Sequence, residues 1–206
     1  MKSKIIDFLK YINRFGIYNG FILFLKIKMN RAENIYVPGI QYPICLRPDT
    51  TDISAFKHVF LRLEYNFKTN IDPKVIIDGG ANIGLSAIYF KNRFPNATII
   101  AVEPDKGNFT LLKKNLSAYE NIHLKHSGLW NKKVSANVID KYNNGEWGMA
   151  IEESSSLTND VITTVTIGEL IEEFKINKID LLKLDIEAAE KILFKDNYSN
   201  WLRKRK

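Results

Sequence analysis

The stretch from Val75 to Phe90 constrains the fold of this chain more than any other. A β-branched apolar run ends in Asp78, a glycine-rich loop covers residues 79–84, and an amphipathic segment begins at Leu85. This order is typical of a buried parallel strand that leads into a helix through a tight turn. It predicts an open α/β sheet, in which ligands bind at the carboxyl ends of the strands.

The glycine loop argues against a dinucleotide. In a G-x-G-x-x-G fingerprint counted from Gly80, the second glycine would fall at Asn82, a polar side chain where a pyrophosphate needs bare backbone. The pattern D-x-G-x-N-x-G instead resembles the first motif of class I S-adenosylmethionine (SAM) methyltransferases. Glu103 ends a second apolar run, 19 residues after Gly84, where a carboxylate can accept both ribose hydroxyls. A generic βαβ unit with an incidental acid is the alternative.

Composition indicates one domain and narrows the choice of partner. The 206 residues are 45% hydrophobic, enough for one sizeable core. Residues 1–31 carry a net charge of +6 and residues 203–206 carry +4, so the total of +7 leaves −3 for residues 32–202. A mildly acidic body argues against nucleic-acid binding. The basic ends suit an anionic membrane or an acidic partner, and simple solvation is the alternative.

The cysteine count and the first 30 residues indicate in which cellular compartment the protein resides. Cys45 is the one cysteine, so the chain has no internal disulfide, which fits a reducing, cytoplasmic compartment. The start of the chain lacks the features of a signal peptide, and the uncharged stretch 15–25 is too short to span a bilayer. We expect two amphipathic helices, 3–14 and 18–28, that pack on the domain or lie on a membrane surface.

Hydrophobic periodicity predicts the other elements. Before the glycine loop, we expect two short strands around a Pro-Gly turn and then a helix, at 34–37, 42–47 and 53–65. In the core, we expect strands alternating with helices, at 74–78, 83–93, 98–103, 105–117 and 121–126. After the core, we expect three inserted antiparallel strands, at 134–139, 148–152 and 161–165. A helix at 167–174, a strand at 179–185 and a helix that opens at Ile186, over 186–190, follow them.

Charged side chains gather where the strand 179–185 ends. Lys183 and Asp185 share one face of that strand because side chains alternate, and Glu187 and Glu190 share a face of the next helical turn. Parallel strands end at one edge of a sheet, so this group falls on the same side as Asp78 and Glu103. We interpret it as catalytic, with helix capping and a surface salt bridge as the alternative.

Taken together, these motifs resemble the FkbM family of SAM-dependent methyltransferases over residues 34–202. The segments that carry the resemblance occur in the family's order: Asp78-Gly-Gly-Ala-Asn-Ile-Gly84, Val102-Glu-Pro-Asp105, Asn108 to Asn115, Ser127-Gly-Leu-Trp-Asn131, Thr166-Ile-Gly-Glu-Leu170 and Leu181-Leu-Lys-Leu-Asp-Ile-Glu-Ala-Ala-Glu190. The resemblance implies a class I Rossmann-like fold. It also implies SAM-dependent O-methylation, commonly of a hydroxyl on a sugar, glycan or related metabolite.

The resemblance also implies roles for individual residues. Asp185 and Glu187 would face the methyl-transfer centre, with Lys183 in support. Direct base catalysis is favoured over a divalent cation held by the carboxylates, and no metal ligands are assigned. Ala188 departs from the family, which usually has glycine there. The cofactor-binding residues would be Asp78, Gly79, Gly80, Ala81, Asn82, Gly84, Glu103, Pro104, Ser127 and Gly128.

The resemblance divides the chain into basic N-terminal helices, 1–33, and an FkbM-like domain, 34–206. The family fold continues with a fifth strand and a closing antiparallel pair, for which this sequence has no counterpart. We therefore expect an incomplete domain whose fourth core strand, 179–185, is an exposed edge. Two other functions stay open: an inactive fragment that binds SAM weakly or not at all, and a nicotinamide-dependent oxidoreductase.

Overall fold

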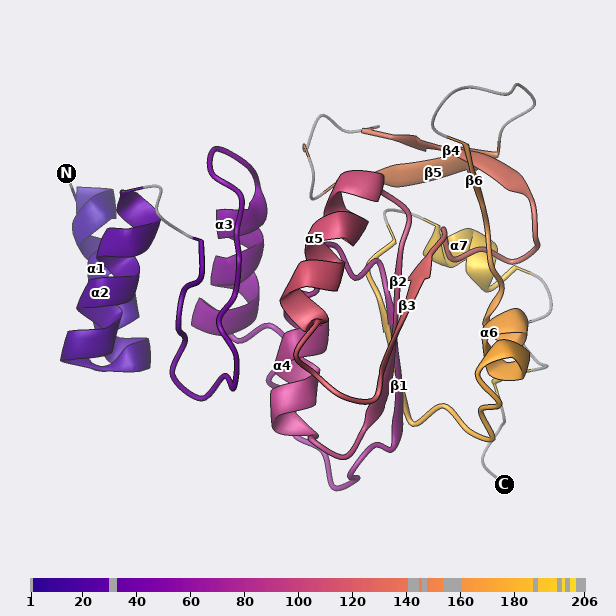
Figure 1. Ribbon diagram of the computed structural model, residues 1–206, viewed down its shortest axis with the longest axis horizontal. Helices are drawn as coiled ribbons and strands as arrows, with labels where there is room; N and C mark the ends of the chain where they lie inside the picture. Colours follow the sequence, from indigo (N-terminus) through magenta and orange to yellow (C-terminus); the bar gives the residue numbers. More distant parts are fainter. Residues whose placement is uncertain are drawn as a thin grey trace.

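A computed structural model of the protein describes residues 2–29, 33–140, 145, 148–153, 161–186, 189–195, 198 and 201–202. Figure 1 shows two N-terminal helices at one end of the long axis, a central α/β unit, and a small antiparallel sheet beside that unit. The architecture is α/β, as the sequence predicts.

The central sheet has four parallel strands, in the order β3-β2-β1-β7. Their bounds are Val75–Gly79 for β1, Thr98–Glu103 for β2, Ile122–His126 for β3 and Leu181–Leu184 for β7. The register pairs Asp78 with Ala101 on one side and with Lys183 on the other. The carboxyl ends of β1, β2 and β7 therefore meet at one edge, which confirms the predicted convergence.

Successive side chains of β1 and β2 point to opposite faces of the sheet, and each face is covered by its own hydrophobic core. Ile76 and Ile99 lie in one buried cluster, with side chains of α4 (Leu85–Arg93) and α5 (Lys106–Leu116). Ile77 and Ile100 lie in the other, with side chains of α6 (Ile167–Glu173) and α7 (Glu190–Leu193). Because successive side chains of a strand point to opposite faces, a strand buried on both faces is apolar throughout. Figure 1 shows α4 and α5 on one side of the sheet and α6 on the other.

A second sheet is inserted between β3 and β7. It contains β4 (Ser135–Ile139), β5 (Ala150–Glu153) and β6 (Val161–Thr163), antiparallel in the order β5-β4-β6. This confirms the predicted antiparallel insertion, although the second strand begins two residues later than expected and the third ends two residues earlier.

The predicted strands at 34–37 and 42–47 are wrong, because this segment forms only one isolated antiparallel bridge, between Ile35 and Ile44. Pro38 and Pro43 have no N–H groups to donate to a ladder, so the pairing does not extend.

The predicted helix at 53–65 is too long. It comprises α3 (Asp52–Phe56) and a π-helical turn, η1 (Lys57–Leu61), and left-handed backbone at Leu63 (φ 57°) ends it. The helix predicted to open at Ile186 is also misplaced, since α7 begins at Glu190. Ile186 lies before the helix, and its N–H donates a hydrogen bond to the Glu190 carboxylate (3.1 Å).

The two predicted N-terminal helices are present as α1 (Lys2–Phe15) and α2 (Ile17–Lys28), and they pack against each other as a hairpin. They approach closely at Gly20, where an added Cβ would lie 2.5 Å from the carbonyl oxygen of Tyr11. The hairpin is held to η1 by an ion pair between Lys57 and Asp7 (2.9 Å) and by a hydrogen bond from Arg14 to the Phe60 carbonyl (3.0 Å). In the described part of the chain, no helix has the length and apolar character needed to cross a membrane.

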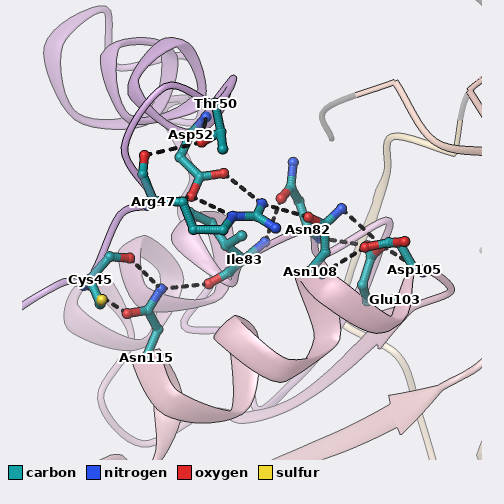
Figure 2. Close-up of polar contacts among 10 residues, drawn as sticks. All are labelled: Cys45, Arg47, Thr50, Asp52, Asn82, Ile83, Glu103, Asp105, Asn108 and Asn115. Carbon is teal, nitrogen blue, oxygen red and sulfur yellow. Dashed lines mark hydrogen bonds and ion pairs between the residues drawn. The ribbon is translucent and has the colours of Figure 1, made fainter. Parts of the chain in front are cut away.

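Asn115 of α5 joins the segment before the sheet to the glycine loop (Figure 2). Its carboxamide accepts from the N–H of Cys45 (2.8 Å) and donates to the carbonyls of Cys45 (3.1 Å) and Ile83 (2.9 Å). All three partners are backbone groups, and Asn115 is buried. Buried backbone groups need such partners. The Asn115 side chain therefore holds both the segment at Cys45 and the glycine loop at Ile83 against α5.

We expect Asn115→Ala to lower the free energy of unfolding by about 2–4 kcal/mol, because it leaves buried backbone groups without partners. Urea denaturation measures the change. Asn13→Ala, the same replacement at an exposed position of α1, is the matched control and should change stability by less than about 0.5 kcal/mol. Equal losses in the two variants would contradict this role for Asn115.

Candidate functional site

A cavity of about 240 Å³ lies at the carboxyl ends of β1, β2 and β7. It is bordered by the glycine loop, the residues after β2, the end of β7, the turn after η1 and the inserted sheet. Eight of the residues that the sequence assigns to the site line it: Gly80, Ala81, Asn82, Glu103, Pro104, Gly128, Lys183 and Asp185.

Four assigned residues that the structure describes are not among the lining. Asp78 and Gly79 belong to β1 beneath the loop, and Gly84 packs on Leu112 and Leu116 of α5. Ser127 is buried and donates its hydroxyl to the carbonyl of Thr163 (2.5 Å). Glu187, like Ala188, lies outside the described residues.

The glycine loop runs directly against the end of β7. Gly80 has a φ of 71°, and a Cβ at this position would lie 1.9 Å from the backbone oxygen of Asp185. The N–H groups of Gly80 and Ala81 both donate to the carbonyl of Val102 (3.0 Å each). Only glycine permits this approach, so Gly80 brings the ends of three strands into one site.

A buried ion pair lies below the loop. The ammonium of Lys183 is 3.0 Å from Oδ1 of Asp78, as an ion pair rather than an aligned hydrogen bond. Lys183 also donates to the carbonyl of Gly80 (2.7 Å), and Ser86 donates to the other carboxylate oxygen of Asp78 (2.5 Å). Burial by itself lowers the pKa of Lys183, but the opposing effect of Asp78, Tyr65 and Asp185 is larger and raises it. Lys183 therefore stays charged, which favours a positioning role over that of a base.

Glu103 places a buried carboxyl group in the cavity wall. Its two oxygens accept from the backbone N–H groups of Asn82 (2.7 Å) and Asp105 (3.0 Å). Burial raises the pKa of Glu103 to about 7, and hydrogen bonds from Asp105, Asn82 and Asn108 offset only part of that effect. A carboxyl group that titrates near neutrality beside a cavity is typical of a functional site.

A polar network behind Glu103 supports its orientation (Figure 2). Arg47 pairs with the buried Asp52 (2.7 Å) and donates to the side-chain oxygen of Asn108 (2.7 Å). Asn108 in turn donates to Glu103 (3.4 Å), and its own N–H donates to the Asp105 side chain, which caps the start of α5 (2.7 Å). The sequence analysis names Asn108 only as part of the family resemblance and gives it no role in the site. Its link to Arg47, 61 residues away, is a tertiary contact.

Part of the cavity wall consists of residues that the sequence analysis did not assign to the site. Tyr65, Glu64 and His58 line the cavity there. His58 lies 3.1 Å from Glu64 and 2.8 Å from a guanidinium nitrogen of Arg62. Burial raises the pKa of Tyr65 to about 12, despite the opposing effect of Lys183, so its phenol is a hydrogen-bond donor at neutral pH. The sequence analysis missed these residues because it continued the helix to residue 65. In the structure the left-handed backbone at Leu63 ends the helix and redirects the chain toward the cavity.

Asp185 is the carboxylate best placed for chemistry in the described part of the site. It borders the cavity, its side chain is 49% exposed, and it lies 3.9 Å from the ammonium of Lys183. The described residues contain no group of three or more histidine, cysteine, aspartate and glutamate side chains suited to a metal ion. The arrangement can hold a polar ligand against Glu103 and present a carboxylate to a second reactant.

Comparison with known proteins places the chain in a family. A sequence model described as the Methyltransferase FkbM domain matches residues 78–205, more than half of the chain. The chain belongs to the FkbM methyltransferase family. The match contains Asp78, Glu103, Lys183 and Asp185, so both the buried ion pair and the carboxyl groups of the cavity lie within the FkbM domain.

Two curated methyltransferases are similar to this FkbM-family chain. Methyltransferase 1 of Beauveria bassiana (strain ARSEF 2860) is 24% identical over 155 residues, covering 65% of this chain and 62% of that protein. Methyltransferase sdnD of Sordaria araneosa is 24% identical over 167 residues, covering 66% of this chain and 64% of that protein. The chain thus spans less than two thirds of the length of either relative.

Among solved structures, methyltransferase FkbM from Methylobacillus flagellatus KT aligns with 94% of this chain and 44% of that one, at 16% identity and a TM-score of 0.47. The assignment to the FkbM family rests on the sequence match.

We expect Lys183→Met to lower the free energy of unfolding by about 3–5 kcal/mol, because it leaves the Asp78 carboxylate buried without its cation. Thermal and urea denaturation measure the loss. Adding Asp78→Asn should recover part of it, since the second change removes the uncompensated charge. Lys74→Met is the matched control, because Lys74 pairs with Asp72 at the surface and should matter far less. Strictly additive effects of the two core substitutions would rule out the coupling.

Proposed function

We propose that the protein is a SAM-dependent O-methyltransferase that acts on a hydroxyl of a sugar, a glycan or a related metabolite. The observation that carries the proposal is the buried Glu103 carboxyl group, at the end of β2, in the same cavity as the glycine loop and Asp185. Membership of a methyltransferase family supports the reaction class and favours it over nicotinamide-dependent oxidoreduction.

The cofactor side of the cavity suits a ribose. Glu103 is fixed by two backbone donors and borders the cavity, so its ionised form can accept hydrogen bonds from neighbouring hydroxyls. The backbone of Gly80 and Ala81 borders the same space, where a ligand can approach without meeting a large side chain. When bound, SAM supplies an electrophilic methyl group.

The acceptor side requires a base, because a carbohydrate hydroxyl is a weak acid and loses its proton as the new bond forms. In this proposal Asp185 takes that proton, and Glu187 is the second candidate. Lys183 holds Asp78 and the Gly80 carbonyl in place, and its charge lies 3.9 Å from Asp185. A divalent cation on Asp185 and Glu187 is the alternative way to acidify the hydroxyl, and it ranks second.

We also propose a cytoplasmic location and no nucleic-acid partner. The supporting features are the one free cysteine, the buried Cys45, and the net charge of −3 on residues 32–202.

The first test is calorimetric titration with SAM over a range of pH. The Glu103 carboxyl has a pKa of about 7 in the free protein, and the ionised form is the better acceptor for the ribose. Below that pH a proton must leave on binding, so affinity should fall about tenfold per unit as the pH decreases and level off above neutrality.

Glu103→Ala should weaken SAM binding by about 1.5–3 kcal/mol for each lost charge-assisted hydrogen bond and remove this pH dependence. Glu173→Ala, which removes a surface carboxylate paired with Lys125, is the matched control and should bind SAM as the wild type does. Unchanged affinity in Glu103→Ala would refute the ribose assignment, and a wild type that does not bind SAM would refute the proposed cofactor.

The second test concerns the base. Asp185→Asn should lower turnover by roughly two to four orders of magnitude while SAM affinity changes little, since proton transfer is felt in the transition state. Methyl transfer to a panel of deoxysugar and glycan acceptors measures turnover, and Asp72→Asn at the surface is the control. A loss of SAM affinity with unchanged turnover would reduce Asp185 to a binding residue. Loss of activity on adding a chelator would favour the cation.

A further inference from the structure

Helix α2 is mostly apolar yet buries only part of its surface. Eight of its 12 residues are large and apolar, in the sequence Ile17-Tyr-Asn-Gly-Phe-Ile-Leu-Phe-Leu-Lys-Ile-Lys28. Its buried residues are Gly20, Leu23 and Ile27, which share one face. Large apolar side chains therefore also lie outside the buried face, at Ile17, Tyr18 and Phe21.

The exposed apolar side chains of the protein concentrate on this hairpin. Of the 13 large apolar residues that are exposed in the described chain, seven lie between residues 5 and 29. Ile17 and Tyr18 are the most exposed, at 80% and 76%. We call these seven residues the hairpin face: Ile5, Ile6, Leu9, Ile17, Tyr18, Phe21 and Met29. Concentrated apolar exposure of this kind marks an interaction surface.

The two helices contribute to one continuous face. Ile5 and Leu9 are one turn apart on α1, as are Ile17 and Phe21 on α2. The ring of Phe8 on α1 joins the two helices, 6.3 Å from the ring of Phe21 and 5.2 Å from that of Phe24. The sides of α1 that carry Asp7 and Arg14 are turned toward η1 instead, through the contacts with Lys57 and Phe60.

Cations border the apolar residues. Lys28 is three turns after Ile17 and so lies on the same side of α2, and Lys10 is one turn after Ile6 on α1. Both lysines are exposed. Residues 1–31 together hold seven basic residues and one acid. Exposed apolar side chains flanked by lysines suit a surface that is anionic at its boundary and apolar just beneath.

We propose that the hairpin face docks on an anionic lipid bilayer. Its aromatic and aliphatic side chains enter the boundary between headgroups and acyl chains, while Lys10 and Lys28 meet the lipid phosphates. The hairpin lies on the bilayer, because neither helix is long and apolar enough to cross it. Figure 1 shows the hairpin at one end of the molecule, away from the central sheet. This inference is independent of the proposed reaction.

Charge favours a bilayer over a second copy of the chain. Pairing two hairpin faces would bring together two segments of net charge +6 each, and like charges at an interface oppose association. An anionic membrane instead attracts this charge, and the attraction is screened by salt.

The first experiment measures sedimentation of the 206-residue chain with vesicles. We expect it to sediment with vesicles of phosphatidylcholine and phosphatidylglycerol in equal amounts, to bind pure phosphatidylcholine weakly, and to dissociate at high salt. Ile17→Ser combined with Tyr18→Ser should weaken binding by about tenfold or more. Tyr36→Ser combined with Ile71→Ser, at exposed positions outside the hairpin, is the matched control and should bind as the wild type does.

The second experiment places a reporter on the hairpin face. The fluorescence of Tyr18→Trp, corrected for the wild-type spectrum, should shift to the blue on adding the anionic vesicles, whereas that of Tyr36→Trp should not. Equal sedimentation of both double variants, or equal shifts of both tryptophan variants, would overturn the proposal. A dimer that Ile17→Ser/Tyr18→Ser disrupts, in a protein that does not bind vesicles, would overturn it in favour of self-association.

Discussion

The candidate site depends on one buried interaction, the ion pair between Lys183 and Asp78. A charge buried on its own is costly, so each of these groups requires the other to remain at its position. The pair joins β7 to β1, which are more than 100 residues apart in the chain, and Lys183 also holds the glycine loop through the carbonyl of Gly80. The close contact of Gly80 with Asp185 then brings the exposed carboxylate to the cavity.

The remaining walls are held to this frame by two asparagines on α5. Asn115 fixes the chain at Cys45 against the glycine loop, and Asn108 connects Arg47 to Glu103. The two side chains are seven residues apart, so they lie on one face of the helix, two turns from each other. A single helix thereby positions both the Glu103 carboxyl group and the segment that leads to His58, Glu64 and Tyr65 in the cavity wall.

Sequence reasoning succeeded where a local pattern has one structural solution. The apolar runs that end in Asp78, Glu103 and Asp185 are strands, two of them buried on both faces, and parallel strands of a single sheet end at one edge, so their convergence follows. The predictions of strands within 34–47 and of a helix over 53–65 failed. There the apolar spacing resembles that of a strand or a helix, but prolines leave a single bridge and a left-handed residue ends the helix. Tyr65 consequently lines the cavity without having been expected there.

The sequence by itself determined the α/β class, the glycine turn after β1 and the set of carboxylates at the sheet edge, because strand periodicity and turn chemistry act over a few residues. The tertiary structure alone decided which of those groups reach the cavity. It placed Ser127 against Thr163 and Gly84 against α5, surrounded Glu103 with donors, and left one face of the N-terminal hairpin uncovered. Those outcomes depend on contacts between residues far apart in the chain, whose distances and burial no local pattern encodes.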